Sequence, residues 1–206
     1  MARPAEPTIP ERAYREIKRR LLDGTFKLRA RLDASAISQD LGISVTPVRE
    51  ALVRLAAERF VFVRPAKGFY VMLWTEAELR DLYLWRGQLA ELAVRQRKGA
   101  FAAPAAGGDF AEDVANLLRA LHHEAVNGEI IRAADNAEDR LRRARSVEPE
   151  LWADVREEAE ALAEILRDAP IDKAGAAVAT YHWRRAEHAK QLRELAALKD
   201  LPSNGG

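Results

Sequence analysis

The sequence predicts a mainly α-helical protein, in which three helices and a β-hairpin precede an all-helical bundle. Apolar residues recur at helical spacings of three and four along most of the 206 residues. The β-prone stretches are confined to residues 60–73. Charge divides the chain at the same place, since residues 1–73 hold 14 basic and 8 acidic side chains and the remainder holds 19 and 24. We therefore expect two domains, at 8–73 and 75–200, with different partners.

The first two helices of the amino-terminal domain have clear boundaries. Apolar residues at spacings of three and four, with charged residues between them, predict an amphipathic helix over 11–23. A short second helix is expected to begin at Asp33, because an aspartate is a preferred N-cap. It should run through Leu41 and end at Gly42, since glycine readily closes a helix.

The third helix is separated from the second by a short turn that contains glycine. Ser44 is the expected N-cap, and Pro47 falls in the first turn, where a missing N–H group costs little. Five apolar residues then fall on one face: Val48, Ala51, Leu52, Leu55 and Ala56. The outward face should carry Val45, Thr46, Arg49, Glu50, Val53 and Arg54.

A β-hairpin is expected after the third helix. The segment FVFVR (60–64) and the segment FYVML (69–73) flank the turn PAKG (65–68). Two helices joined by a tight turn, followed by a hairpin with a basic tip, are the order of a winged helix-turn-helix. A small α+β scaffold that binds nothing is the alternative.

From Thr75 onward the pattern is helical only. A capping box at Thr75–Glu78 opens a long helix to about Arg97, and GAFAAPAAGGD (99–109) reads as a loop. Further helices are expected over 110–126, 128–145, 149–168 and 171–198. This part of the chain should therefore form an all-α bundle.

Composition excludes several classes of protein. The absence of cysteine excludes a disulfide framework, a thiolate nucleophile and a zinc site with sulfur ligands. No apolar run approaches the ~18–20 residues that a membrane-spanning helix needs, and the charged start is not a secretory signal. No nucleophile motif or glycine-rich phosphate loop is found. We therefore expect a cytoplasmic protein that is not an enzyme and has no membrane partner.

The stretch LGISVTPVREALVRLAAERFVFVRPAKGFYV (41–71) resembles the helix-turn-helix and wing of GntR-family bacterial transcription regulators. Its most specific part is TPVREAL (46–52). The resemblance implies a homodimer, usually a repressor, that binds a palindromic operator in double-stranded DNA and responds to a small metabolite.

The expected DNA-contacting residues lie at the start of the third helix, along its outer face and at the hairpin tip. They are Ser44, Val45, Thr46, Arg49, Arg54, Lys67 and Gly68. The helix N-terminus offers N–H groups to a phosphate, and glycine permits close approach of the wing to the minor groove. The alternative for Arg49 and Arg54 is a solvated charge on the helix surface.

Val45 departs from the family pattern, in which an arginine commonly lies between the serine and threonine of the turn. Arginine pairing with guanine is the commonest specific base contact, worth about 1–3 kcal/mol of discrimination. Valine can still pack on a thymine methyl group. We therefore expect a shifted or relaxed operator preference and not a loss of DNA binding.

The helical remainder resembles the FadR-type carboxy-terminal (FCD) domain in its helix layout, in the run around Arg86 and in a last helix bearing His182. The resemblance implies that Arg86 grips the carboxylate of an effector and that His182 lines the same pocket. Arg86 shares an apolar helix face, so its guanidinium needs an anionic partner. A salt bridge to a nearby Glu or Asp is the alternative for Arg86, and a hydrogen-bonded core residue is the alternative for His182. The aromatic residues of these helices are expected to pack in the core and at a dimer contact.

Many FCD domains hold a divalent metal through an aspartate and three histidines, and this set is incomplete here. The aspartate and first histidine positions fall near Val114 and Leu118, and the second histidine position falls at Glu160 or Ala161. Only His182 matches, and one imidazole does not bind a transition metal tightly. His122 and His123 are neighbours about 100° apart on a helix, so we expect that they do not share an ion. The sequence therefore predicts no metal and no other cofactor.

Two other functions remain open from the sequence. A winged helix can use its third helix for a protein partner instead of DNA. The helical domain can also be a degenerate sensor, which would leave an effector-independent DNA binder.

Overall fold

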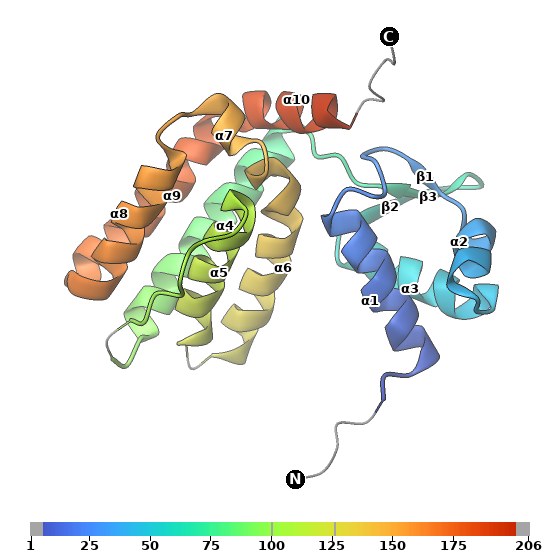
Figure 1. Ribbon diagram of the computed structural model, residues 1–206, viewed down its shortest axis with the longest axis horizontal. Helices are drawn as coiled ribbons and strands as arrows, with labels where there is room; N and C mark the ends of the chain where they lie inside the picture. Colours follow the sequence, from blue (N-terminus) through green and yellow to red (C-terminus); the bar gives the residue numbers. More distant parts are fainter. Residues whose placement is uncertain (1–5, 100, 126, 201–206) are drawn as a thin grey trace. The chain divides into compact units, whose positions relative to one another are not determined.

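The computed structural model of the protein describes residues 6–99, 101–125 and 127–200. Its chain divides into two compact units, one formed by residues up to Leu73 together with Asp200 and the other by Trp74–Lys199 (Figure 1). Among these residues no helix is long and apolar enough to cross a membrane.

The three predicted helices of the first unit are confirmed, as α1 (Ile9–Leu22), α2 (Ala34–Leu41) and α3 (Val45–Ala57). The Asp33 carboxylate accepts from the backbone N–H of Ser35 and Ala36, which fixes the start of α2. Gly42 adopts a left-handed conformation with φ of 64° and ends α2 as predicted. The turn to α3 is therefore set by local sequence.

The first unit has its own hydrophobic core, made by the inward faces of these helices and the sheet. The fully buried members from the helices are Ala13, Ile17, Leu21, Val48, Ala51, Leu52 and Leu55. Because α1 packs across α3, the apolar face of α3 is anchored and its opposite face is left outward.

A three-stranded antiparallel sheet completes the unit. The hairpin strands β2 (Val61–Arg64) and β3 (Gly68–Val71) pair in register from Val61 opposite Val71 to Arg64 opposite Gly68. The strand order is β1-β3-β2, and β1 (Arg31–Leu32) was not expected from the sequence. Two residues are too short to show an alternating pattern, so only pairing with β3 defines this strand.

The second unit is entirely helical among the described residues. Its helices are α4 (Glu76–Gln96), α5 (Phe110–His123), α6 (Gly128–Arg145), α7 (Glu148–Leu151), α8 (Val155–Asp168), α9 (Ile171–Glu187) and α10 (Ala189–Lys199). The predicted capping box is present, with Thr75 accepting from the N–H of Glu78 and Glu78 accepting from that of Thr75. Residues 100 and 126, at the edges of predicted elements, lie outside the described residues.

Two predicted helices are interrupted. The helix expected over 149–168 breaks where Trp152 becomes extended, with φ −135° and ψ 129°. The helix expected over 171–198 breaks at His188. The rings of these two residues meet edge to face at 5.2 Å, and the Arg184 guanidinium lies 4.7 Å from the indole. The two breaks therefore lie in contact with each other, and no local periodicity signals either of them.

Helices α4 and α9 pack most extensively within the second unit (Figure 1). Gly87 of α4 makes the close approach possible, because a Cβ atom there would lie 3.0 Å from the Cβ of His182 on α9. This contact brings the predicted effector residues Arg86 and His182 onto neighbouring helices.

Candidate nucleic-acid interface and buried polar cluster

The outward face of α3 carries polar side chains at its amino-terminal end. Ser44, Thr46 and Arg49 are exposed and Val45 is half-buried, whereas Pro47 on the opposite side is buried. The Ser44 hydroxyl makes no capping hydrogen bond, so the first-turn N–H groups of α3 lack a side-chain cap. A helix start of this kind attracts an anion such as a phosphate.

The two arginines predicted on α3 differ in their surroundings. Arg54 stacks on the Tyr14 ring at 3.6 Å, and it donates to Glu58 at 3.1 Å and to Glu11 at 3.2 Å. Arg49 is exposed, and no acceptor for it is found within the described residues. Arg49 is therefore available to an external anion, whereas Arg54 would have to exchange partners first.

The hairpin tip presents the other predicted contacts. Lys67 is exposed, and Gly68 has φ of 92°, a conformation that favours glycine. Arg64 is an exposed residue of the same wing and packs on two aromatic rings, a contact that was not predicted from the sequence. Its guanidinium lies 4.7 Å from the Tyr70 ring and 5.3 Å from the Phe62 ring, and these two rings stack on each other across the strands. The alternation along both strands, which puts the three side chains on one face of the sheet, is the signal that reveals it.

The helical unit has a charged cluster in its interior. Among the described residues, seven arginine, glutamate and histidine side chains are at most 1% exposed, namely Arg86, Arg145, Arg185, Glu138, Glu148, His122 and His182. Buried charges are costly unless they are paired and hydrogen-bonded. Most of these side chains have a partner of opposite charge, whereas several of their polar atoms have no hydrogen-bond partner among the described residues.

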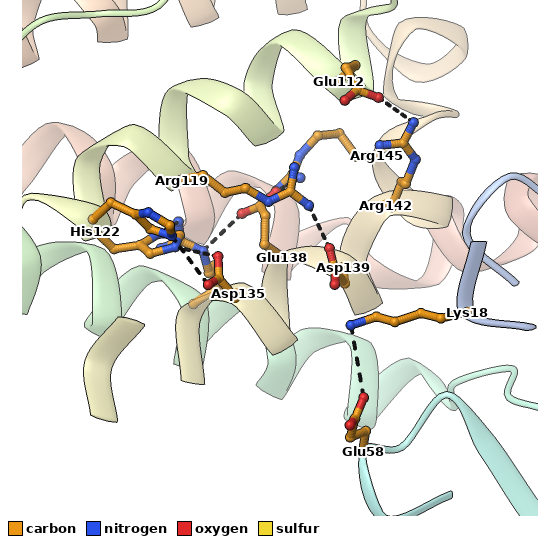
Figure 2. Close-up of polar contacts among 12 residues, drawn as sticks. Lys18, Glu58, Glu112, Arg119, His122, Asp135, Glu138, Asp139, Arg142 and Arg145 are labelled. Atoms are coloured by element: carbon orange, nitrogen blue, oxygen red, sulfur yellow. Dashed lines mark hydrogen bonds and ion pairs between the residues drawn. The ribbon is translucent and has the colours of Figure 1, made fainter. Parts of the chain in front are cut away.

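Arg86 is held by three groups of its own unit. Its Nε donates to the Glu138 carboxylate at 3.0 Å, and its Nη2 donates to the Leu118 carbonyl at 3.1 Å and lies 3.2 Å from Nδ1 of His122. Glu138 also accepts from Arg145, so two guanidiniums share one carboxylate (Figure 2). Burial and the nearby Arg145 charge lower the pKa of Arg86 to about 9, which still leaves it charged at neutral pH.

Five buried polar atoms of the cluster and of Tyr181 have no hydrogen-bond partner among the described residues: Nη1 of Arg86, Nε and Nη2 of Arg145, Oη of Tyr181 and Nε2 of His182. His182 Nδ1 lies 2.7 Å from the Val178 carbonyl and donates to it, so its Nε2 presents a lone pair. The cluster thus combines guanidinium donors with an imidazole acceptor. The structure places Arg86 and His182 on neighbouring helices and gives each the alternative arrangement: Arg86 forms a salt bridge with Glu138, and His182 is a hydrogen-bonded core residue. Arg145 and Tyr181, which the sequence did not single out, also have unpaired polar atoms here.

The sequence predicts that His122 and His123 do not share an ion, but it does not predict that both rings reach one carboxylate. Nε2 of His122 lies 2.9 Å from Asp135 and Nε2 of His123 lies 3.3 Å from it, because the rings converge from adjacent positions onto the next helix. These atoms nevertheless do not fit a metal. Arg86 donates to Nδ1 of His122, which places the ring proton on Nε2 and removes the lone pair that an ion would need.

The buried histidines should make stability depend on pH. Burial and the Arg86 charge lower the pKa of His122 to about 4, whereas the unfolded chain takes up this proton near the ordinary value of about 6.5. Stability from the neutral ring is complete above about pH 6.5 and declines as the pH falls toward 4. Replacing His122→Asn should flatten that decline by up to about 1.4 kcal/mol per pH unit, measured by urea unfolding.

The exposed neighbour gives the control, since His123→Asn should keep the wild-type slope. An unchanged slope in His122→Asn would contradict a neutral buried ring.

Comparison with known proteins identifies the first unit. The family model described as "Bacterial regulatory proteins, gntR family" matches residues 10–71. The transcriptional repressor GlaR of Escherichia coli is 35% identical over 81 residues, which covers 39% of this chain and 37% of GlaR. The regulator McbR of the same organism is 37% identical over 79 residues, covering 38% and 36%. The matched region thus spans little more than a third of these relatives, which are transcriptional regulators and not enzymes.

Solved structures extend the likeness in fold to the helical unit. A GntR regulator from Rhodococcus sp. RHA1 superposes with a TM-score of 0.74 at 19% identity, covering 88% of this chain and 97% of that one. Escherichia coli McbR superposes with a TM-score of 0.62 at 20% identity, covering 89% and 98%. At such identities the likeness shows the fold alone. Residues 10–71 of this chain therefore match the model of the bacterial gntR regulatory family, and the helical unit has the fold found in these two solved regulators.

Proposed function

We propose that this protein is a sequence-specific transcription regulator that binds a palindromic operator in double-stranded DNA as a homodimer. One recognition helix reads only a few base pairs, so two-fold pairing of half-sites is the usual solution. Repression is the proposed outcome because the relative GlaR is named a repressor. The domain limits proposed from the sequence, 8–73 and 75–200, would then divide DNA binding from sensing and dimerisation.

The outward end of α3 carries this proposal. Ser44, Thr46 and Arg49 project from a helix whose other face is anchored by α1, and Arg49 has no acceptor within the described chain. This arrangement suits entry into the major groove, with the tip at Lys67 and Gly68 on the minor groove. Val45 is half-buried at the same end, where it can pack on a thymine methyl group.

For the helical domain we propose an FCD-type sensor without a metal, tuned by a small carboxylate metabolite. The unpaired guanidinium donors of Arg86 and Arg145 support an anionic ligand group, because a carboxylate satisfies such donors. The lone pair of His182 supports a hydroxyl or amine donor on the same ligand. Stabilisation of the purified protein by hydroxycarboxylates in a thermal shift assay, reduced in Arg145→Met, would support this part.

A salt titration tests the DNA proposal. Genomic fragments that the protein retains are sequenced, and binding to the recovered site and to a scrambled duplex is measured at two salt concentrations. Affinity should fall steeply with salt on both duplexes, as counterion release requires, and remain higher for the recovered site. A protein that retains no DNA, or binds it without salt dependence, is not a regulator of this kind.

One observation favours a second candidate, a protein-binding winged helix. Val53 on α3 and Val63 on β2 are 59% and 55% exposed, and apolar side chains suit a protein partner better than a phosphate. In that case the duplex titration would show no salt slope.

An effector-independent regulator is the remaining alternative, because Glu138 already accepts a hydrogen bond from the Arg86 guanidinium. This alternative predicts that no carboxylate changes the affinity of the protein for its operator.

A further inference from the structure

Exposed apolar side chains concentrate on two helices of the second unit. Of the nine large apolar residues that are exposed among the described residues, five belong to α4 and α9: Leu84, Trp85, Leu92, Ile171 and Trp183. Leu84 and Trp183 also line a groove of about 370 Å³ between these helices. Exposed apolar side chains beside a groove of this kind are typical of an interaction surface.

The exposed face of α4 forms a narrow stripe. Asp81, Leu84, Gln88, Leu92 and Arg95 are all exposed. At 100° per residue they fall within about 40° of Gln88 on either side of the helix. The stripe therefore faces one direction along four turns, and we call it the α4 stripe.

The α4 stripe has a two-fold pattern centred on Gln88. Leu84 and Leu92 lie four residues before and after it, and Asp81 and Arg95 lie seven residues before and after it. Apolar positions thus mirror apolar positions, and a negative charge mirrors a positive one. A stripe with this pattern is complementary to a second copy of itself running in the opposite direction.

We propose that α4 packs antiparallel against α4 of a second copy of this chain, about a two-fold axis at Gln88. Leu92 of one copy then enters the space between Leu84 and Trp85 of the other. Each Asp81 meets the Arg95 of the other copy, which gives two ion pairs per dimer. This inference rests on the homodimer of the proposed function and names its surface.

The charges of the α4 stripe favour a second copy of this chain over other partners. Arg95 is 72% exposed and reaches only as far as 4.0 Å from Glu91 of its own helix. For Asp81, no ion pair is found in the part of the chain that the structure describes. Antiparallel pairing supplies both with a partner of opposite sign, whereas a parallel arrangement would place like charges together.

Charge reversal tests the pairing. Asp81→Arg and Arg95→Asp should each weaken dimerisation by about 10–100-fold, because each places two like-charge pairs across the interface. An equimolar mixture of the two variants should recover dimers, since every 81–95 contact in the mixed dimer is again opposite in sign. Sedimentation velocity measures the populations. Glu157→Arg and Arg167→Asp, exposed on α8, are matched controls that should leave the dimer unchanged.

A cysteine tests the axis without changing any charge. Because the chain has no cysteine, a disulfide in Gln88→Cys can form only between two molecules. The axis brings the two Cα atoms within the roughly 7 Å that a disulfide requires, so mild oxidation should crosslink this variant almost fully. Glu157→Cys is the control and should remain monomeric on a denaturing gel.

Specific outcomes would overturn the pairing. A dimer that tolerates both charge reversals, or a Gln88→Cys variant that crosslinks no better than its control, places the interface elsewhere. If Asp81→Arg lowers the helix content while sedimentation still shows the dimer, the charges serve only the dipole of α4. These results leave the DNA proposal standing. Loss of salt-dependent DNA binding with intact crosslinking would instead count against the proposed function alone.

Discussion

Replacing Glu138→Leu is expected to lower the free energy of unfolding of the helical domain by about 3–5 kcal/mol. Glu138 is fully buried and is the carboxylate that Arg86 and Arg145 share. Leucine fills a similar volume, so the main cost is two guanidiniums left without a counter-charge in a low-dielectric interior. Chemical denaturation followed by circular dichroism measures the loss.

Two variants make this result interpretable. Glu76→Gln removes an exposed i,i+4 pair with Arg80 and should change stability by less than about 0.5 kcal/mol. Replacing all three members, Arg86→Met, Glu138→Leu and Arg145→Met, should recover most of the stability, because apolar replacements of a buried charge cluster are often neutral. A triple variant as unstable as Glu138→Leu would show that packing, and not uncompensated charge, is the cause.

The second large effect is expected at Arg49. Replacing Arg49→Ala should weaken operator binding by about 1–3 kcal/mol per half-site, and a dimer contacts two half-sites. The reason is that Arg49 is exposed at the outward end of α3 and has no acceptor of its own within the described residues. Fluorescence anisotropy with the recovered operator measures the change, and the unfolding midpoint should stay the same.

Three comparisons give this prediction its specificity. Lys67→Ala should weaken operator and scrambled duplex alike and reduce the salt slope of the dimer by about two, because each copy loses one phosphate contact. Arg54→Ala should lower the stability of the first unit, since Arg54 stacks on Tyr14 and bonds Glu11 and Glu58. Arg167→Ala on α8 is the neutral control. Operator binding that Arg49→Ala leaves unchanged would place the DNA contact on another surface.

The fold was predictable wherever local chemistry decides it. The caps at Asp33, Gly42 and Thr75 act through groups within four residues, so the sequence alone locates them. Elements that depend on distant partners were not predictable. Strand β1 is defined only by its pairing with β3, and the helix break at Trp152 lies against the ring of His188, which is far away in the sequence.

The candidate sites divide in the same way. The outward residues of α3 follow from helical periodicity, because the apolar positions leave only one exposed face. The partners of Arg86 lie 52 and 32 residues away along the chain, on helices whose packing a single sequence does not reveal. The roles of Arg145 and Glu138 were missed for this reason. Whether His122 and His123 can hold a metal likewise depends on the tautomer of His122, which is set by its hydrogen bond from Arg86.

The opposite charges at the two ends of the α4 stripe have a consequence for gene duplication. A chain that carries both Asp81→Arg and Arg95→Asp still pairs with itself, but with the original chain it places like charges together at both contacts. Two substitutions would thus be enough to give a duplicated copy its own assembly, which shares no subunits with its parent. Regulators of the same fold can then act in one cell without forming mixed complexes.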